Sequence, residues 1–291
     1  MMGCVVRVVG DLEINPGQWR RTAIGTAFCV QVPSEIHDDR WYSYVVTAHH
    51  VIDAQPTPEL LFPDSRIPGT LHPPIQTPGP DWIQPIESVD LAVLPFDRRD
   101  GTWINTLRAG FQLYETLPGD ALLPMPFHYV GLLEPLNRAM ARSGTLGAVY
   151  QEGIEHPDGY EYEAHLGDCR TYAGFSGSPC FVEITFASLT PQEPIVPAPP
   201  ELGPLGRLRY LHLLCGMVTW HLERSSNAPE ASLYGVVVML TSDEIWGALM
   251  SPDLVRGRRR LDDDPDAGST DGFLLGAQEG AWQSFSKGNM P

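Results

Sequence analysis

The sequence lacks several features that would assign it to a membrane or a nucleic acid. It has no run of 18 or more apolar residues, so it predicts no membrane-spanning helix. Its first residues, MMGCVVRVVGDLE, contain neither an extended apolar core nor a small-residue cleavage site, unlike a signal peptide. Positive charge is scarce, with 19 Lys and Arg against 36 Asp and Glu and a formal net charge of −17. We therefore expect a cytoplasmic protein with no nucleic acid and no membrane as partner.

Cysteine pairs with metal-binding spacing are also lacking. The number of cysteines is odd, their spacings are irregular and no C-x-x-C pair occurs, so no zinc site is expected. Three of them, Cys29, Cys180 and Cys215, lie inside apolar runs. This placement predicts small buried hydrophobic side chains in a reducing compartment. The five are Cys4, Cys29, Cys169, Cys180 and Cys215.

Helical periodicity is rare, and short runs rich in Val, Tyr, Phe and Leu dominate. The 28 Gly and 28 Pro fit many turns between short strands. One segment, TSDEIWGALM (241–250), predicts a helix, with Thr241 or Ser242 as its cap and Ile245, Trp246 and Leu249 on one face. Many strands and one late helix predict an all-β sandwich or pair of barrels. The expected strands are 4–10, 25–32, 41–48, 90–96, 127–133, 145–150, 178–184, 211–220 and 234–240.

Three segments do not continue this pattern. Two proline-rich stretches, roughly 55–85 and 190–206, predict extended surface loops, because strand patterns resume after each of them. The tail, residues 251–291, pairs a basic with an acidic cluster and has few periodic apolar positions, which predicts disorder.

Three motifs contain residue types that work together in nucleophilic catalysis. VVTAHHV presents His50 after a strand, SVDLAVL places Asp90 at the start of another, and GFSGSP presents Ser176 between small residues. A serine hydroxyl is a poor nucleophile at neutral pH and needs a base within hydrogen-bond reach. An imidazole can take that proton and return it to a leaving group.

Together the motifs resemble the chymotrypsin-like (trypsin-like) serine peptidases of the bacterial or intracellular type. In that family the histidine lies in T-A-x-H, the aspartate in D-[IL]-A-[LV]-[LIV] and the serine in G-x-S-G-[GS]-P, in this chain order. ARSGTLGAV, GMVTWH and YGVVVMLTSDEIWGAL also resemble family strands and the C-terminal helix, so the resemblance spans about residues 20–250. It implies a peptidase domain over 1–250 with two six-stranded antiparallel β-barrels, at about 1–115 and 120–240, followed by helix 241–250.

The resemblance also implies a role for each site residue. His50 would be the base, Asp90 would orient it, and Ser176 would form an acyl-enzyme, with the N–H groups of Gly174 and Ser176 as the oxyanion hole. Thr219 matches a serine that supports the aspartate. The predicted substrate-binding residues are Arg170, which would favour an acidic side chain before the scissile bond, and the cleft-wall residues Thr219, Trp220 and His221.

Neighbouring residues offer rival assignments. His49 adjoins His50, but the motif places the base at its fourth position, and His49 is expected to be a packed histidine. Asp81, Glu87 and Asp97 are not followed by an apolar strand pattern as Asp90 is, and Ser178 is expected to be structural.

Two departures from the family bear on activation. Phe175 stands where the digestive and clotting enzymes have the aspartate that pairs with a newly cut N-terminus, so activation by N-terminal insertion is not expected. Val51 stands where extracellular members have a cysteine, which removes that disulfide.

The sequence thus predicts a serine endopeptidase that acts on a protein or peptide substrate without metal or organic cofactor, and leaves room for a regulatory protein partner. The alternative is a catalytically silent or latent trypsin-like scaffold that binds proteins. An α/β-hydrolase esterase would require the triad order Ser, Asp, His, which this chain does not have.

Overall fold

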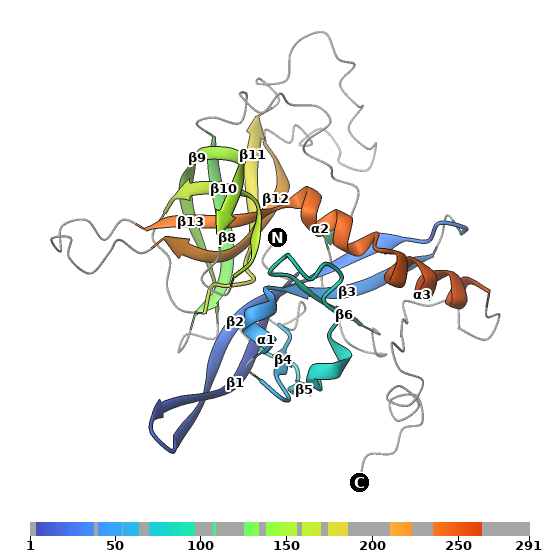
Figure 1. Ribbon diagram of the computed structural model, residues 1–291, viewed down its shortest axis with the longest axis horizontal. Coiled ribbons are helices and arrows are strands. Elements are labelled where there is room, and N and C mark those ends of the chain that lie inside the picture. The colour runs from blue at the N-terminus through green and yellow to red at the C-terminus, as the bar shows by residue number, and fades with distance from the viewer. Residues whose placement is uncertain are drawn as a thin grey trace, which may run out of the picture.

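The computed structural model describes residues 4–37, 40–53, 55–63, 70–96, 107–108, 125–133, 138–155, 159–169, 174–185, 210–222 and 235–263. They form an N-terminal sheet and a C-terminal barrel that lie side by side, with two helices at the C-terminal end (Figure 1). Strand β8 of the barrel contacts β1 and β2 of the sheet, so the two halves share an interface. Within these ranges no helix is long and apolar enough to cross a membrane.

The N-terminal sheet has the order β5-β4-β1-β2-β3-β6, and all neighbours in this order are antiparallel. A two-residue strand, β7, pairs parallel with β2. Val, Phe, Tyr and Leu side chains of these strands are buried in one hydrophobic cluster. The strands are β1 (Val5–Asn15), β2 (Gln18–Pro33), β3 (Trp41–Thr47), β4 (Glu59–Leu61), β5 (Ile75–Gln76), β6 (Ala92–Pro95) and β7 (Leu107–Arg108).

The C-terminal barrel is closed, with six antiparallel strands in the order β10-β13-β12-β11-β8-β9. Closure gives every strand two hydrogen-bonded neighbours and leaves no open edge. The strands are β8 (Pro126–Leu133), β9 (Arg138–Glu155), β10 (Glu161–Asp168), β11 (Pro179–Thr185), β12 (Tyr210–Leu222) and β13 (Val236–Thr241).

The expected architecture of two antiparallel β-barrels is confirmed, with a difference in the first half. Hydrogen bonds close the C-terminal barrel, whereas the strand path of the N-terminal sheet is open within the described residues. All five cysteines are free and buried, as expected for small hydrophobic side chains.

The proline-rich stretch 55–85 differs from the expected surface loop. It contributes β4, which pairs with β1, and buries Leu60, Phe62 and Trp82 in the core. The apolar side chains between the prolines therefore outweigh the turn-forming residues. The second proline-rich stretch, 190–206, lies outside the described residues.

The predicted C-terminal helix is α2 (Ser242–Leu249), which leads from the barrel toward the N-terminal sheet (Figure 1). The Thr241 hydroxyl caps it by accepting a hydrogen bond from the Glu244 N–H at 3.2 Å. Ile245 and Leu249 are buried, and Trp246 packs against the same core.

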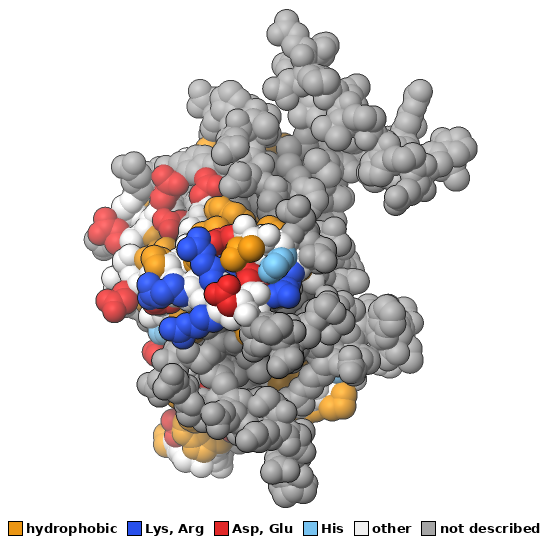
Figure 2. All heavy atoms as spheres, turned by 90° about the vertical axis from the view of Figure 1, so that its right-hand side faces the viewer, with side chains coloured by type: hydrophobic (Ala, Val, Ile, Leu, Met, Phe, Trp, Pro, Cys, Tyr) orange, Lys and Arg blue, Asp and Glu red, His pale blue; other side chains and the backbone are white. Residues whose placement is uncertain are grey.

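The expectation of a disordered tail from residue 251 is wrong for its first part, because helix α3 (Pro252–Asp262) follows α2 directly. Leu254 of this helix is fully buried. Figure 2 faces the side of the molecule where α3 lies in Figure 1, and arginine and acidic side chains are mixed there. Residues 264–291 lie outside the described residues.

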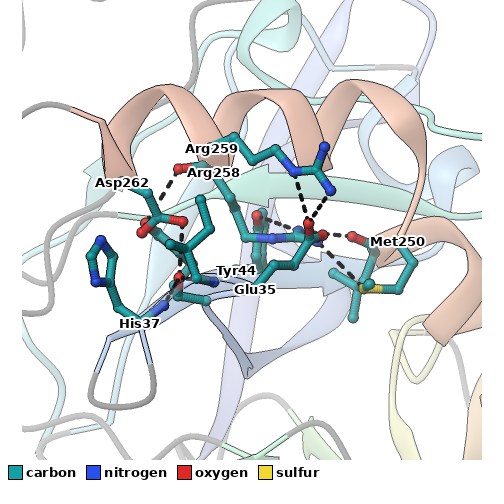
Figure 3. Close-up of polar contacts among 11 residues, drawn as sticks. Glu35, His37, Tyr44, Met250, Arg258, Arg259 and Asp262 are labelled. Carbon is teal, nitrogen blue, oxygen red and sulfur yellow. Dashed lines mark hydrogen bonds and ion pairs between the residues drawn. The ribbon is translucent and has the colours of Figure 1, made fainter.

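Polar contacts hold α3 against the end of β2 and against β3 (Figure 3). The Arg258 guanidinium, fully buried, donates to the Tyr44 hydroxyl at 3.0 Å and to the Leu249 carbonyl at 2.9 Å. Asp262 accepts hydrogen bonds from Tyr42 and, at 2.8 Å, from Ser34. The helix is therefore tied to the N-terminal sheet although it follows the barrel in the chain.

Candidate active site

His50 and Asp90 lie together at one end of the N-terminal sheet. His50 is the second residue of the short helix α1 (His49–Asp53), which follows β3, and Asp90 lies two residues before β6. These strands pair antiparallel with Thr47 opposite Ala92, so the end of β3 meets the start of β6. The strand register therefore brings together two residues that are 40 positions apart in the sequence.

The Asp90 carboxylate holds the His50 ring in one orientation. Its Oδ2 lies 2.8 Å from His50 Nδ1, and its Oδ1 accepts the His50 backbone N–H at 2.9 Å. Asp90 is fully buried, while the His50 side chain is 27% exposed. An Nδ1 proton shared with Asp90 leaves Nε2 as the ring nitrogen that can accept a proton from a nucleophile.

Ser176 lies in a tight turn between two glycines with left-handed backbone conformations. Gly174 has φ +92° and Gly177 has φ +84°, values that glycine adopts without steric cost. Phe175 is 1% exposed, and its ring meets Tyr129 edge to face at a centroid distance of 5.3 Å. The residue that replaces the family's aspartate is thus an apolar anchor that fixes this turn in the barrel core.

Thr26 of β2 joins this turn to the N-terminal sheet. Its N–H donates to the Ser176 carbonyl at 2.8 Å, and its hydroxyl donates to the Gly174 carbonyl at 2.8 Å. The Thr47 hydroxyl donates in turn to the Thr26 carbonyl at 2.7 Å. A Cβ at Gly177 would collide with that same carbonyl oxygen. The sequence motifs did not single out Thr26 or Thr47 as site residues, although the motif VVTAHHV contains Thr47.

These contacts place the three candidate triad residues in one region. Ser176 bonds to Thr26, Thr26 bonds to Thr47, and Thr47 lies three residues before His50. The Ser176 hydroxyl forms no hydrogen bond to any other residue in the described part of the chain. Long nucleophile–base distances are common in structures without substrate, because the contact tightens when substrate binds.

The backbone groups predicted to bind an oxyanion are available. Within the described ranges, the N–H groups of Gly174 and Ser176 donate to no other residue, whereas those of Gly177 and Ser178 donate to Val218 and Phe175. The two unused donors flank the buried Phe175.

The predicted cleft-wall residues differ in burial. Thr219 is fully buried, donates to the Val238 carbonyl at 3.2 Å and accepts from Tyr162 at 2.7 Å. Its side chain is therefore not exposed, and the expected contact of Thr219 with a substrate stays a prediction. Trp220 is half-buried against the core. Arg170 and the His221 side chain lie outside the described residues.

The structure also describes most of the residues that were alternatives to the candidate triad. His49 Nδ1 lies 2.9 Å from the Tyr160 hydroxyl, as expected for a packed histidine. Ser178 is fully buried. Asp81 is 8% exposed, and burial raises the pKa of its carboxyl. Asp97 lies outside the described residues. No group of three or more His, Cys, Asp or Glu in the described part of the chain is arranged to hold a metal ion.

A pocket of about 550 Å³ is lined by residues that neighbour the His50–Asp90 pair in the sequence or, through Tyr160 and His49, by a polar contact. One of its walls, Glu87 and Ser88, comes from the segment just before Asp90, and the other comes from the β9–β10 hairpin. Its lining residues are Glu87, Ser88, Gly153, Gly159, Tyr160, Glu161, Tyr162 and Glu163.

Comparisons with known proteins identify the fold. No family model and no curated protein matches the sequence. Among solved structures, the protease domain of MamO from Magnetospirillum magneticum matches with a TM-score of 0.54 and 12% identity, over 85% of this chain and 96% of that one.

Two further solved structures align less well. The HtrA-type protease AlgW with a decapeptide has a TM-score of 0.47 and 12% identity, over 89% of this chain and 65% of that one. The Rv3671c protease of M. tuberculosis in its active form has a TM-score of 0.48 and 16% identity, over 86% and 81% of the two chains. From its closed barrel, its open companion sheet and the MamO match, the chain has the fold of the chymotrypsin-like serine proteases.

Proposed function

We propose that this protein is a serine endopeptidase that hydrolyses peptide bonds through an acyl-enzyme at Ser176. The observation that carries the proposal is the buried Asp90 carboxylate, which binds both the backbone N–H and the ring Nδ1 of His50. A partly exposed histidine held in this way, in the same region as a serine turn, supports the proposal of general-base catalysis.

The proposed reaction has two halves, acylation of Ser176 and hydrolysis of the resulting ester, and each group acts once in each half. His50 Nε2 takes the Ser176 hydroxyl proton as Oγ attacks the scissile carbonyl, and Asp90 stabilises the resulting imidazolium. The N–H groups of Gly174 and Ser176 bind the oxyanion. The imidazolium then protonates the leaving amine, the C–N bond breaks and an ester remains on Ser176. A water molecule repeats the sequence, giving its proton to His50, and releases the acid and Ser176.

Labelling with a fluorophosphonate probe tests the nucleophile. The wild-type protein should be labelled covalently, and Ser176→Ala should not be labelled. Ser178→Ala is the matched control, because it removes a buried serine hydroxyl from the same turn and should leave labelling intact.

Replacing Asp90 by Asn tests the base. The Asn side-chain amide would donate to His50 Nδ1 and leave the proton on Nε2, so that Nε2 could no longer accept one from Ser176. We expect kcat to fall by about 10⁴-fold while the fold is retained, as judged by circular dichroism. A loss smaller than about tenfold would contradict the assigned role of Asp90.

A non-catalytic protein-binding scaffold is the second candidate. It is favoured by one observation, that the Ser176 hydroxyl has no hydrogen bond to His50 in the described part of the chain. A folded wild-type protein with no Ser176-dependent labelling would support this candidate, or a latent enzyme that requires a regulatory partner.

The predictions of a cytoplasmic location and a bacterial source stay predictions. The five free, buried cysteines support the proposal of a reducing compartment.

A further inference from the structure

The pocket between the Glu87 segment and the β9–β10 hairpin has acidic walls. Glu87 stands on one wall and Glu161 and Glu163 on the other, and the lining residues in the described part of the chain include no Lys, Arg or His. Its volume of about 550 Å³ is ample for a long side chain. We propose that this pocket binds a lysine or arginine side chain of the peptide substrate, a proposal that rests on the proposed peptidase function.

Hydrogen bonds connect this pocket to the candidate active site on two sides. The Tyr160 hydroxyl lies 2.9 Å from Nδ1 of His49, the residue before the proposed base. The Tyr162 hydroxyl donates to Thr219 on β12, next to Val218, whose carbonyl accepts the Gly177 N–H. These contacts reach residues next to His50 and next to the serine turn, so we expect the pocket to face a peptide bound at Ser176.

The geometry of β10 directs two of the carboxylates to the same side. Residues two apart on a strand share a face, so Glu161 and Glu163 lie on one face of β10. Gly153 of β9 and Gly159, which comes just before β10, line the pocket with positive φ, and a Cβ at Gly159 would meet no atom within 4 Å. This side of the pocket therefore leaves space for an entering side chain.

The chemistry of the lining selects a cation. An extended aliphatic stem can pack beside the Tyr160 ring while its charged end reaches the carboxylates. An acidic side chain would meet like charge on both walls. Glu87 and Glu161 are exposed at the surface, so a substrate can reach them without a movement of the backbone.

A library of quenched fluorescent peptides tests this specificity. Each position around the cleavage site is varied among Lys, Gln and Glu. The wild-type protein should cleave the Lys peptide about tenfold faster in kcat/KM than the Gln peptide at one position. Glu87→Gln and Glu161→Gln together should reduce that preference to about twofold, and rising salt should also weaken it.

Two variants make the experiment more specific. Glu13→Gln, on strand β1 and away from the pocket, removes the same charge and should leave the preference unchanged. Glu161→Lys should shift the preference at the same position from Lys toward Glu. Cleavage without any Lys preference, or a Lys preference that survives both Gln substitutions, would overturn the pocket proposal and leave the peptidase proposal standing.

A binding measurement tests the pocket proposal independently of the peptidase proposal. Fluorescence anisotropy measures the affinity of Lys and Gln versions of a labelled peptide for Ser176→Ala, which binds without turnover. We expect about tenfold tighter binding of the Lys peptide, lost with Glu87→Gln and Glu161→Gln. Glutamate-dependent binding to a wild-type protein that cleaves nothing would support the pocket and overturn the peptidase. Equal binding of the two peptides would overturn the pocket.

Discussion

Replacing Arg258 tests what holds helix α3 against the N-terminal sheet. We expect Arg258→Ala to destabilise the protein, because this side chain is fully buried and its guanidinium bonds to Tyr44 and Leu249. The guanidinium also lies 3.4 Å from the Met250 sulfur and 3.7 Å from the Glu35 carboxylate (Figure 3). The substitution thus removes the polar centre of the contact between α3 and the sheet.

The expected cost follows from the groups that lose their partner. The Leu249 carbonyl and the Tyr44 hydroxyl would each stay buried without this donor, at about 1–3 kcal/mol apiece, and the aliphatic stem would leave a cavity. We therefore expect Arg258→Ala to lower the free energy of unfolding by about 3–5 kcal/mol. Arg258→Met keeps an apolar stem, and Glu35 keeps its 2.6 Å pair with Arg259, so about 1–3 kcal/mol is expected.

These changes in the free energy of unfolding are measured by urea and thermal unfolding, with circular dichroism as the signal. The melting temperature should fall by about 2–4 °C for each kcal/mol lost. Arg260→Ala is the matched control, since Arg260 is an exposed arginine of the same helix, and its cost should stay within about 0.5 kcal/mol. If Arg258→Ala cost no more than Arg260→Ala, the buried arginine would not be what holds α3.

Three further outcomes are expected. Gly177→Ala should reduce fluorophosphonate labelling by at least about 10²-fold, because φ is +84° and a Cβ would collide with Thr26. Burial lowers the pKa of His165 to about 4, so the unfolded state binds its proton better, and stability should fall by about 3 kcal/mol as the pH drops from 6.5 to 4. Trp19→Ser should change stability by less than about 0.5 kcal/mol, since Trp19 is 63% exposed at the β1–β2 hairpin.

Each outcome has a result that contradicts it. Undiminished labelling of a folded Gly177→Ala protein would mean that the turn tolerates a Cβ. His165→Leu should flatten the pH dependence of urea unfolding below pH 6.5, and an unchanged slope would remove His165 as its source. A clear loss of stability in Trp19→Ser would show that the exposed ring contacts the rest of the protein.

Most strands were predictable because alternating or continuous apolar residues mark them locally. Strand β10 was missed although Tyr162, Ala164 and Leu166 alternate with polar residues, because glutamate, glycine and aspartate, which are uncommon in strands, make up much of the segment. Helix α3 was missed for a different reason. Arg258 occupies one of its buried positions, so the apolar periodicity that reveals a helix is interrupted by a charged residue.

Some residues of the candidate site were likewise predictable from the sequence, and others were not. The motifs identified His50, Asp90 and Ser176 because their chemistry depends on side-chain type and chain order. They did not identify Thr26, whose importance comes from its contacts with Ser176 and with Gly174, 148 residues away. Thr219 was predicted to line the cleft, and its full burial became visible only when Tyr162 and Val238 were in place around it.

The sequence by itself determined which residues are candidates for the site, in what order they occur, and that the chain folds as antiparallel strands. These properties depend on side-chain chemistry and on local alternation of apolar residues. Only the tertiary structure decided that Phe175 anchors the serine turn in the barrel core, that Thr26 ties the turn to the other half, and that acidic walls form a pocket beside the site. Such contacts join residues far apart in the chain, and packing selects them from many pairs that the sequence alone leaves equivalent.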